Sequence, residues 1–268
     1  MTGFGELSMW EEMDAMPDGM GQNMEDMLSD MGEVTEEDVA ELQGDIAGIS
    51  LEPELRYDLP NCEEAWVTGG PYEDAAKMDY QQGDNPYHAR GNCGLVSLSN
   101  TLRRAGIDVT EDDVTKYAIE NNLCIFDADG DEGMNGGTTL EMRQEILKGF
   151  GFESDVYYSE TGGSLEEIAD AIDSGRGVLI SVNAGVLWDV DDGTVPVNGK
   201  PPVNHCVAVT GIARDAETGE IRGVYIADSG RGDPGDACRY LTTEEFHEVY
   251  TDVYGSGANI TREPLVEG

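Results

Sequence analysis

Basic residues are scarce in this sequence, and their scarcity excludes several kinds of partner. Lysine and arginine together number 15 against 56 aspartates and glutamates in 268 residues, so the formal net charge is −41. Such a surface repels nucleic acid phosphates and anionic lipid headgroups, and we expect neither nucleic acid nor a membrane as a partner. Cationic partners, divalent ions or a high-salt environment fit this charge better. The low lysine content favours salt adaptation, whereas five cysteines and many methionines argue against it.

Long hydrophobic runs and a signal peptide are also missing. No apolar stretch approaches the roughly 20 residues that span a bilayer, and the N-terminus has no basic region followed by an apolar one. We therefore expect a cytoplasmic protein, or one exported by a route without a cleavable signal peptide. The cysteines are odd in number and lack metal-ligand spacing, so we expect no disulfide framework, no metal site and no cofactor. They are Cys62, Cys93, Cys124, Cys206 and Cys238.

The first 55 residues have a composition of their own, because they are strongly acidic and hold most of the methionines. Seven of these recur at steps of four and three, which places them on one helical face: Met9, Met13, Met16, Met20, Met24, Met27 and Met31. A Pro-Asp-Gly break at residues 17–19 predicts two short helices. Three interpretations stay open: a helical hairpin packed on the main domain, an adaptable docking surface for a chaperone or other partner protein, or disorder. A removable pro-segment is a further hypothesis.

The rest of the chain reads as a lead-in followed by a globular domain. Residues 56–91 are rich in proline, glycine, asparagine and aspartate, and the domain covers residues 92–268. Expected helices cover 92–104, 110–121, 138–149 and 164–175, expected strands cover 177–182, 206–211 and 223–227, and a last helix covers 242–250. Helices followed by strands predict an α+β fold with an antiparallel sheet, preceded by the acidic Met-rich helical extension.

Cys93 is the first candidate for chemistry, because the small-residue turn Gly91-Asn92-Cys93-Gly94 runs directly into a helix-forming stretch. A helix N-terminus lowers the pKa of a thiol and favours the thiolate, which is the nucleophile. Asn92 is a suitable N-cap, and the free backbone N–H of Cys93 can face a developing oxyanion. The alternative is an inert cysteine buried in a helix.

His205 and Asp228 can complete such a site. The chain has three histidines; His88 and His247 are expected at the surface, whereas His205 begins an apolar strand. Asp228 ends the next strand, and antiparallel pairing would bring the two side chains together. A carboxylate there orients the imidazole and stabilises its charged form. The alternatives are a core histidine and an aspartate in the turn before Ser229.

In this order, the three motifs resemble those of the papain-like cysteine peptidases, in particular the group similar to the C39 peptidases and the papain-fold domains of bacterial toxins. The matching segments are 92–94, 204–211 and 225–228, and the resemblance spans roughly residues 80–255. It implies a papain-like fold in which Cys93 is the nucleophile, His205 the general base and then the acid, and Asp228 the orienting residue. It also implies a protein or peptide substrate.

One feature departs from the family pattern. Such enzymes place an oxyanion-hole glutamine about six residues before the cysteine, and Tyr87 occupies that position here. Gln82 is the preferred candidate for this role and Gln81 the second, because an expanded loop can deliver either. His88 and Asn92 are possible substitutes.

The acidic stretch Asp127–Gly133 begins like a calcium-binding loop, with acids at alternate positions. Glu132 stands where such a loop needs glycine, and Thr138 where it needs a bidentate glutamate. We therefore expect a solvated loop.

Together these patterns predict a cysteine-dependent hydrolase that acts through an acyl-enzyme. The leading interpretation is a cysteine peptidase, or a toxin-type effector that uses peptidase chemistry. A deamidase or acyltransferase with the same triad is an alternative, as is a non-catalytic protein-binding module on this scaffold.

Overall fold

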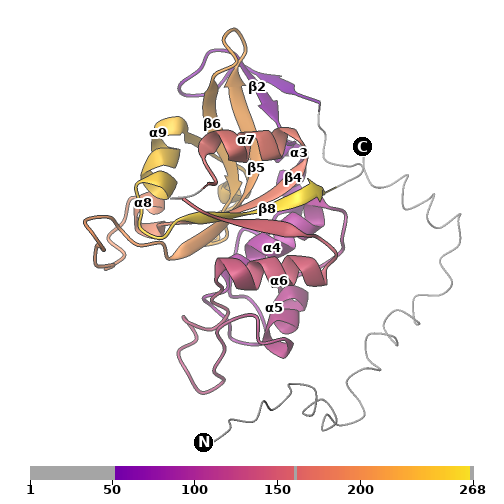
Figure 1. Ribbon diagram of the computed structural model, residues 1–268, viewed down its shortest axis with the longest axis vertical. Coiled ribbons are helices and arrows are strands. Elements are labelled where there is room, and N and C mark those ends of the chain that lie inside the picture. The colour runs from indigo at the N-terminus through magenta and orange to yellow at the C-terminus, as the bar shows by residue number, and fades with distance from the viewer. Residues whose placement is uncertain (1–51, 160–161, 266–268) are drawn as a thin grey trace, which may run out of the picture. The chain divides into compact units, whose positions relative to one another are not determined.

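The computed structural model describes residues 52–159 and 162–265, and its central feature is one antiparallel sheet (Figure 1). The strands are β1 (Glu54–Arg56), β2 (Ala65–Thr68), β3 (Ser154–Tyr158), β4 (Arg176–Val182), β5 (His205–Asp215), β6 (Ile221–Ala227), β7 (Arg239–Thr242) and β8 (Gly257–Pro264). Within the described residues their order is β1-β2-β5-β4-β8-β3, and β6 pairs with both β5 and β7. Because β5 and β6 are antiparallel and Ala208 pairs with Ala227, the start of β5 lies beside the end of β6.

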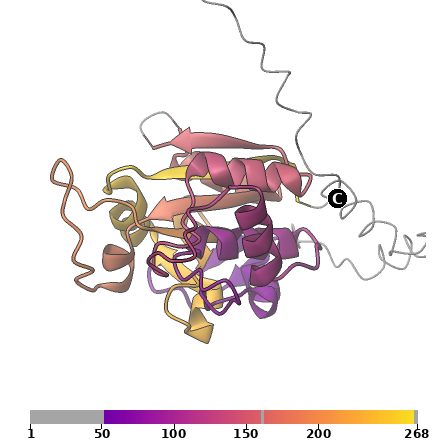
Figure 2. The same cartoon turned by 90° about the horizontal axis from the view of Figure 1, so that it is seen from below.

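Helices cover both faces of this sheet (Figure 1 and Figure 2). They are α3 (Pro71–Asp74), α4 (Cys93–Arg104), α5 (Glu111–Glu120), α6 (Leu140–Gly149), α7 (Leu165–Asp173), α8 (Ala184–Trp188) and α9 (Thr243–Phe246). One core joins α4, α5 and α6 to Leu179 of β4, and a second joins α7 and α9 to Val178 and Ile180. Neighbouring residues of β4 thus enter different cores, as expected for a strand buried on both faces.

Local signals correctly predicted most of the helices. α4 covers the predicted 92–104 almost fully, and α5 begins with a capping box in which Thr110 and Asp113 bond to each other's backbone N–H groups. α7 begins with the same arrangement of Ser164 and Glu167. These reciprocal bonds satisfy N–H groups that a helix start leaves free, which is why the pattern marks the first turn.

Two of the predicted helices differ from the structure in detail. α6 begins one residue later than predicted, because Thr139 rather than Thr138 accepts the hydrogen bond from the Met142 N–H. The last predicted helix, 242–250, is α-helical only to Phe246 and continues as a π-helical turn over residues 247–251.

The predicted α+β fold, with helices leading into an antiparallel sheet, is confirmed. The segment predicted as a lead-in contributes β2 and α3, and β2 pairs with β5 in the same sheet. No helix in residues 52–159 and 162–265 has the length and apolarity to cross a membrane. The predicted helices with the seven methionines at positions 9–31 lie outside the described residues.

Candidate active site

Cys93 is the first residue of α4, as the sequence predicts, and its side chain is half-buried. The two flanking glycines are tightly packed: a Cβ at Gly91 would overlap the Gly133 carbonyl, and one at Gly94 would overlap Thr138. The turn therefore needs glycine because the 133–138 segment lies against it. The first N–H groups of a helix have no partner within the helix, so they are available to a substrate oxyanion.

Asn92 occupies the predicted N-cap position but does not cap the helix with its side chain. Its amide is buried and donates to Glu111 Oε1 at 2.6 Å and Thr115 Oγ1 at 3.3 Å. The amide therefore ties the start of α4 to α5.

His205 and Asp228 meet as the sequence predicts. His205 Nε2 lies 2.7 Å from Asp228 Oδ1, and both side chains are buried. His205 lowers the pKa of the Cys93 thiol, and Cys93 raises the pKa of the His205 ring, so each favours the other's charged form. Because Nε2 is engaged by Asp228, Nδ1 is the ring nitrogen that remains for the thiol. The structure thus has His205 interacting with Asp228 through one ring nitrogen and with the Cys93 thiol as well.

The charges of this relay support one another. Burial raises the pKa of Cys93, but the hydrogen bond and charge of His205, a hydrogen bond from the Cys206 backbone and the charge of Arg143 outweigh it, so the pKa is lowered. Burial lowers the pKa of His205, whereas Asp228 and Cys93 raise it to about 10. Burial raises the pKa of Asp228, but bonds from His205, Trp188 and Gly230 lower it to about 2. At neutral pH the site therefore favours a thiolate beside an imidazolium.

Trp188 and Gly230 are two site residues that sequence reasoning missed. Trp188 Nε1 donates to Asp228 Oδ2 at 2.7 Å, and its ring packs on His205 with centroids 5.1 Å apart. The Gly230 N–H donates to Asp228 Oδ1 at 2.9 Å, and a Cβ there would overlap the indole. The sequence signals that could have indicated them are the position of Trp188 before an acidic loop and that of Gly230 two residues after Asp228. Together they fix both oxygens of the carboxylate.

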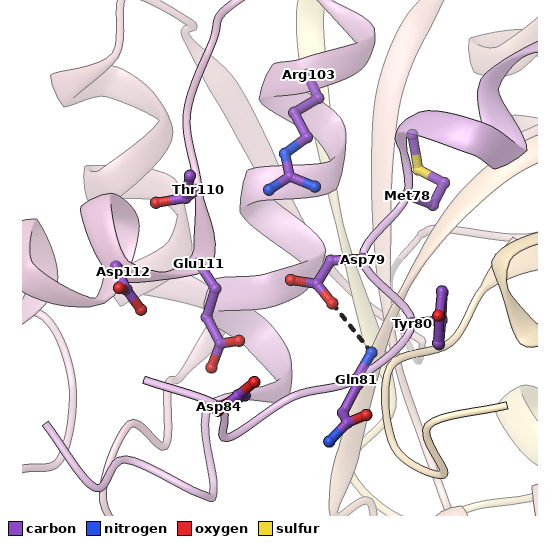
Figure 3. Close-up of a pocket in the computed structure, with 9 residues that line it drawn as sticks. All are labelled: Met78, Asp79, Tyr80, Gln81, Asp84, Arg103, Thr110, Glu111 and Asp112. Atoms are coloured by element: carbon purple, nitrogen blue, oxygen red, sulfur yellow. Dashed lines mark hydrogen bonds between the residues drawn. The ribbon is translucent and has the colours of Figure 1, made fainter. Parts of the chain in front are cut away.

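The two glutamine candidates have different surroundings. The Gln82 N–H donates to the Ser229 carbonyl at 2.8 Å, and its side-chain amide donates to the Arg90 carbonyl at 2.9 Å. Gln82 thus bridges the residue after Asp228 and the residue three positions before Cys93. Gln81 instead lines a pocket that contains none of the three triad residues (Figure 3). Hydrogen bonds therefore tie Gln82, and not Gln81, to the segments next to Asp228 and Cys93.

The proposed substitutes are engaged elsewhere. His88 is exposed and lies 3.7 Å from Glu132, while the Asn92 amide is taken up by Glu111. Glu111 organises the loop between Gln82 and Cys93: its Oε1 also accepts hydrogen bonds from the Gly83 N–H and the Asn85 amide, both at 2.8 Å. Three hydrogen bonds to Glu111 Oε1 thus hold the loop between Gln82 and Cys93 in place.

The other predicted surface features agree with the structure. His247 is exposed, and the acidic loop 127–133 is solvated, with Asp127 and Asp131 accepting bonds from nearby backbone N–H groups. No group of three His, Cys, Asp or Glu that could hold a metal is found in the described part of the chain. Burial raises the pKa of Cys124 and Cys238 to about 11, so Cys93 differs from both in favouring the thiolate.

Comparison with known proteins agrees with these motifs. The model of the Peptidase_C39 like family matches residues 77–258, which include Cys93, His205 and Asp228. A double glycine motif protease from an AMS/PCAT transporter, solved in complex with its leader peptide, is 16% identical; the match covers 64% of this chain and 84% of that one, with a TM-score of 0.35. UfSP from C. elegans is 12% identical over 84% of this chain and 37% of that one, with a TM-score of 0.37. No curated protein matches.

Proposed function

This chain belongs to the Peptidase_C39 like family, and from that premise we propose that it is a cysteine peptidase that cleaves a peptide bond through an acyl-enzyme. The observation that carries the proposal is the relay from the Cys93 thiol through the His205 ring to the Asp228 carboxylate. A nucleophile, a base and an orienting acid within contact of one another are the minimum that this chemistry needs.

In the proposed reaction the Cys93 thiolate attacks the carbonyl carbon of the scissile bond, and the carbonyl oxygen becomes an oxyanion. The N–H of Cys93 and the amide of Gln82 stabilise this charge, once Gln82 turns from the Arg90 carbonyl. Collapse of the intermediate breaks the C–N bond as protonated His205 gives its Nδ1 proton to the leaving amine.

Deacylation reverses these roles. Neutral His205 takes a proton from water, the resulting hydroxide attacks the thioester, and the carboxylic acid product leaves as the Cys93 thiolate and the imidazolium are restored. Asp228 stays ionised throughout and keeps Nε2 protonated, so the other ring nitrogen is free to exchange the proton.

The test is the rate at which iodoacetamide alkylates each cysteine, followed by peptide mass spectrometry at pH 6 to 7. We expect Cys93 to react about tenfold faster or more than Cys62 and Cys238, because burial raises the pKa of these two thiols and each pKa unit changes the thiolate fraction about tenfold. The advantage should disappear in His205→Ala, whereas His247→Ala, which removes an exposed ring, should keep it. Equal rates for Cys93 and Cys62 in the unaltered protein would refute the proposal.

The products then separate peptide cleavage from other reactions of the same triad. Candidate peptides incubated with the protein gain one water per cleaved bond, whereas deamidation or acyl transfer produces different mass changes. The matched control is Cys93→Ala, which keeps a small residue at the start of α4 but lacks the sulfur.

A further inference from the structure

Arg143 carries a buried positive charge that the proposed reaction does not use. Its side chain lies on α6 and the residue is only 2% exposed. The guanidinium donates to Cys206 Sγ, to Ser181 Oγ at 2.7 Å and to the Thr139 carbonyl at 3.3 Å. All three acceptors are uncharged groups when Cys206 is a thiol, and burial together with the charge of Cys93 raises the pKa of that thiol more than Arg143 lowers it. Because a guanidinium stays protonated in proteins, a full charge lies in the interior.

A buried cation without an anion is strongly unfavourable. No carboxylate in residues 52–159 or 162–265 lies within ion-pair distance of Arg143. Glu141, two positions earlier on α6, is exposed, and its carboxylate accepts from Tyr158. Among the described residues, the compensating negative charge therefore comes from a group that is not a carboxylate.

The nucleophile is the available group. Arg143 Cδ lies 3.4 Å from the position that a Cβ on Gly94 would take, so its stem packs on the residue next to Cys93. Cys206, which accepts from Arg143, follows His205 and gives its backbone N–H to Cys93. The Arg143 side chain thus contacts the sequence neighbours of both Cys93 and His205, and its charge acts on the Cys93 thiol.

We propose that Arg143 is a positioning residue whose buried charge is balanced by the Cys93 thiolate. The site then alternates in sign, from Arg143 through Cys93 and His205 to Asp228, and the Arg239 guanidinium lies beyond it, 4.0 Å from Asp228 Oδ2. This inference rests on the proposed function, because it needs Cys93 to be the thiolate. The proposal has a consequence for the second half of the reaction. Acylation neutralises the Cys93 sulfur and leaves Arg143 without its anion. Because the thiolate is the leaving group in deacylation, the Arg143 cation favours that step.

Other charged groups near Cys93 must be considered in a test that varies pH. His205 and Cys206 face it from β5 and Arg143 from α6. Asp228 acts through His205, and Arg239 of β7 lies 4.0 Å from Asp228 Oδ2 and acts through that carboxylate. Glu111 on α5 is separated from the thiol by the Asn92 amide.

The experiment is the pH dependence of Cys93 alkylation in the full chain. Arg143→Gln, which keeps a polar head for Ser181, should raise the midpoint by about one unit and slow alkylation at pH 6 about tenfold. Arg143→Lys keeps the charge and should stay near the unaltered midpoint. Arg90→Gln removes an exposed guanidinium three residues before Cys93 and should change little, because solvent screens it. An unchanged midpoint in a folded Arg143→Gln protein would overturn the proposal.

A second measurement applies if Arg143→Gln does not fold. In a Cys93→Ala background the thiolate is gone, so Arg143→Met should raise the midpoint of urea unfolding relative to Cys93→Ala alone. Loss of the fold in this double variant would show that the cation is needed without the thiolate, and would also overturn the proposal. Failure of the proposed function is distinguishable, because Cys93 would then already react slowly in the unaltered protein.

Discussion

Arg104 and Arg143 are equally deep in this protein, but their surroundings differ. Arg104, at the end of α4, is 3% exposed, and its Nε donates to Asp74 Oδ2 at 2.8 Å. Its remaining N–H groups donate to the carbonyls of Gly69, Val209 and Thr210. Arg143 is 2% exposed and contacts a thiol, a hydroxyl and one carbonyl. Arg104 therefore pairs with a carboxylate, whereas in our proposal the charge of Arg143 is balanced by the Cys93 thiolate.

This difference shows how a buried charge that stabilises the fold can be distinguished from one that serves the active site. The Arg104 cluster joins the segment before the active-site loop to β5, so its bonds hold two parts of the fold together. Arg143 completes no ion pair among the described side chains unless Cys93 is ionised. Burial and residue type are the same in both cases, and only the identity of the partner distinguishes them.

The largest effect is expected when the Arg104 pair is broken. Arg104→Met leaves the buried Asp74 carboxylate with one cation, the half-exposed Lys77 ammonium at 3.1 Å, and should lower the free energy of unfolding by about 3 kcal/mol. Urea denaturation followed by circular dichroism measures this loss. Adding Asp74→Asn should recover much of it, because the buried carboxylate that has lost its guanidinium is then gone and Lys77 is left at the surface.

The comparison predicts that Arg104→Met leaves the pH midpoint of Cys93 alkylation unchanged. A shift as large as that of Arg143→Gln would show that the two arginines do not differ in role. A loss of stability under about 1 kcal/mol would likewise contradict the structural assignment of Arg104.

A smaller effect is expected from the pH dependence of the His205–Asp228 pair. The pKa of Asp228 is lowered to about 2, so its contribution to stability is present above pH 4 and is lost as pH falls toward 2. The pKa of His205 is raised to about 10, so its contribution is present below pH 6.5 and is lost as pH rises through 10. The stability difference between the unaltered protein and Asp228→Asn should therefore peak between pH 4 and 6.5, at about 2 kcal/mol.

Urea titrations at a series of pH values measure this difference. The corresponding difference for Arg104→Met should stay constant from pH 6.5 to 10, because a guanidinium does not lose its proton in this range. A flat profile for Asp228→Asn would mean that the two side chains do not interact as an ion pair.

Several parts of the fold and site were predictable because their signals are local. The capping boxes of α5 and α7 lie within four residues, and the apolar runs of β4 and β5 are continuous, so both follow from neighbouring residues. The order of Cys93, His205 and Asp228 could also be predicted, since each lies at the end of a recognisable element.

The remaining parts depend on tertiary contacts. β8 contains Asn259 and Thr261 at buried positions, where they bond to the Leu140 carbonyl and the Gly177 N–H, so its sequence lacks the apolar alternation of a strand. Trp188 ends a five-residue helix, and nothing near it indicates contact with Asp228, 40 residues away. Arg143 likewise looks like any helix arginine until β4 and β5 pack on it.

Glu111 extends the comparison to a buried anion, and here the smallest effect is expected. Its carboxylate receives three N–H groups from the loop between Gln82 and Cys93 and no basic side chain among those described. Burial raises its pKa, and these three bonds oppose the rise. Glu111→Gln keeps the size but weakens charge-assisted bonds, so we expect a loss of about 1 kcal/mol in stability.

Activity should discriminate this role from that of Arg143. Glu111→Gln should lower kcat about threefold to tenfold, because the loop no longer holds Gln82 in place for the oxyanion, while the midpoint of Cys93 alkylation stays unchanged. The matched control is Asp112→Asn, which removes a neighbouring charge that accepts none of the three bonds. In a Gln82→Ala background Glu111→Gln should cause no further loss of kcat. An additive loss would show that Glu111 acts independently of Gln82, and a shifted alkylation midpoint would place it with Arg143 in tuning the thiolate.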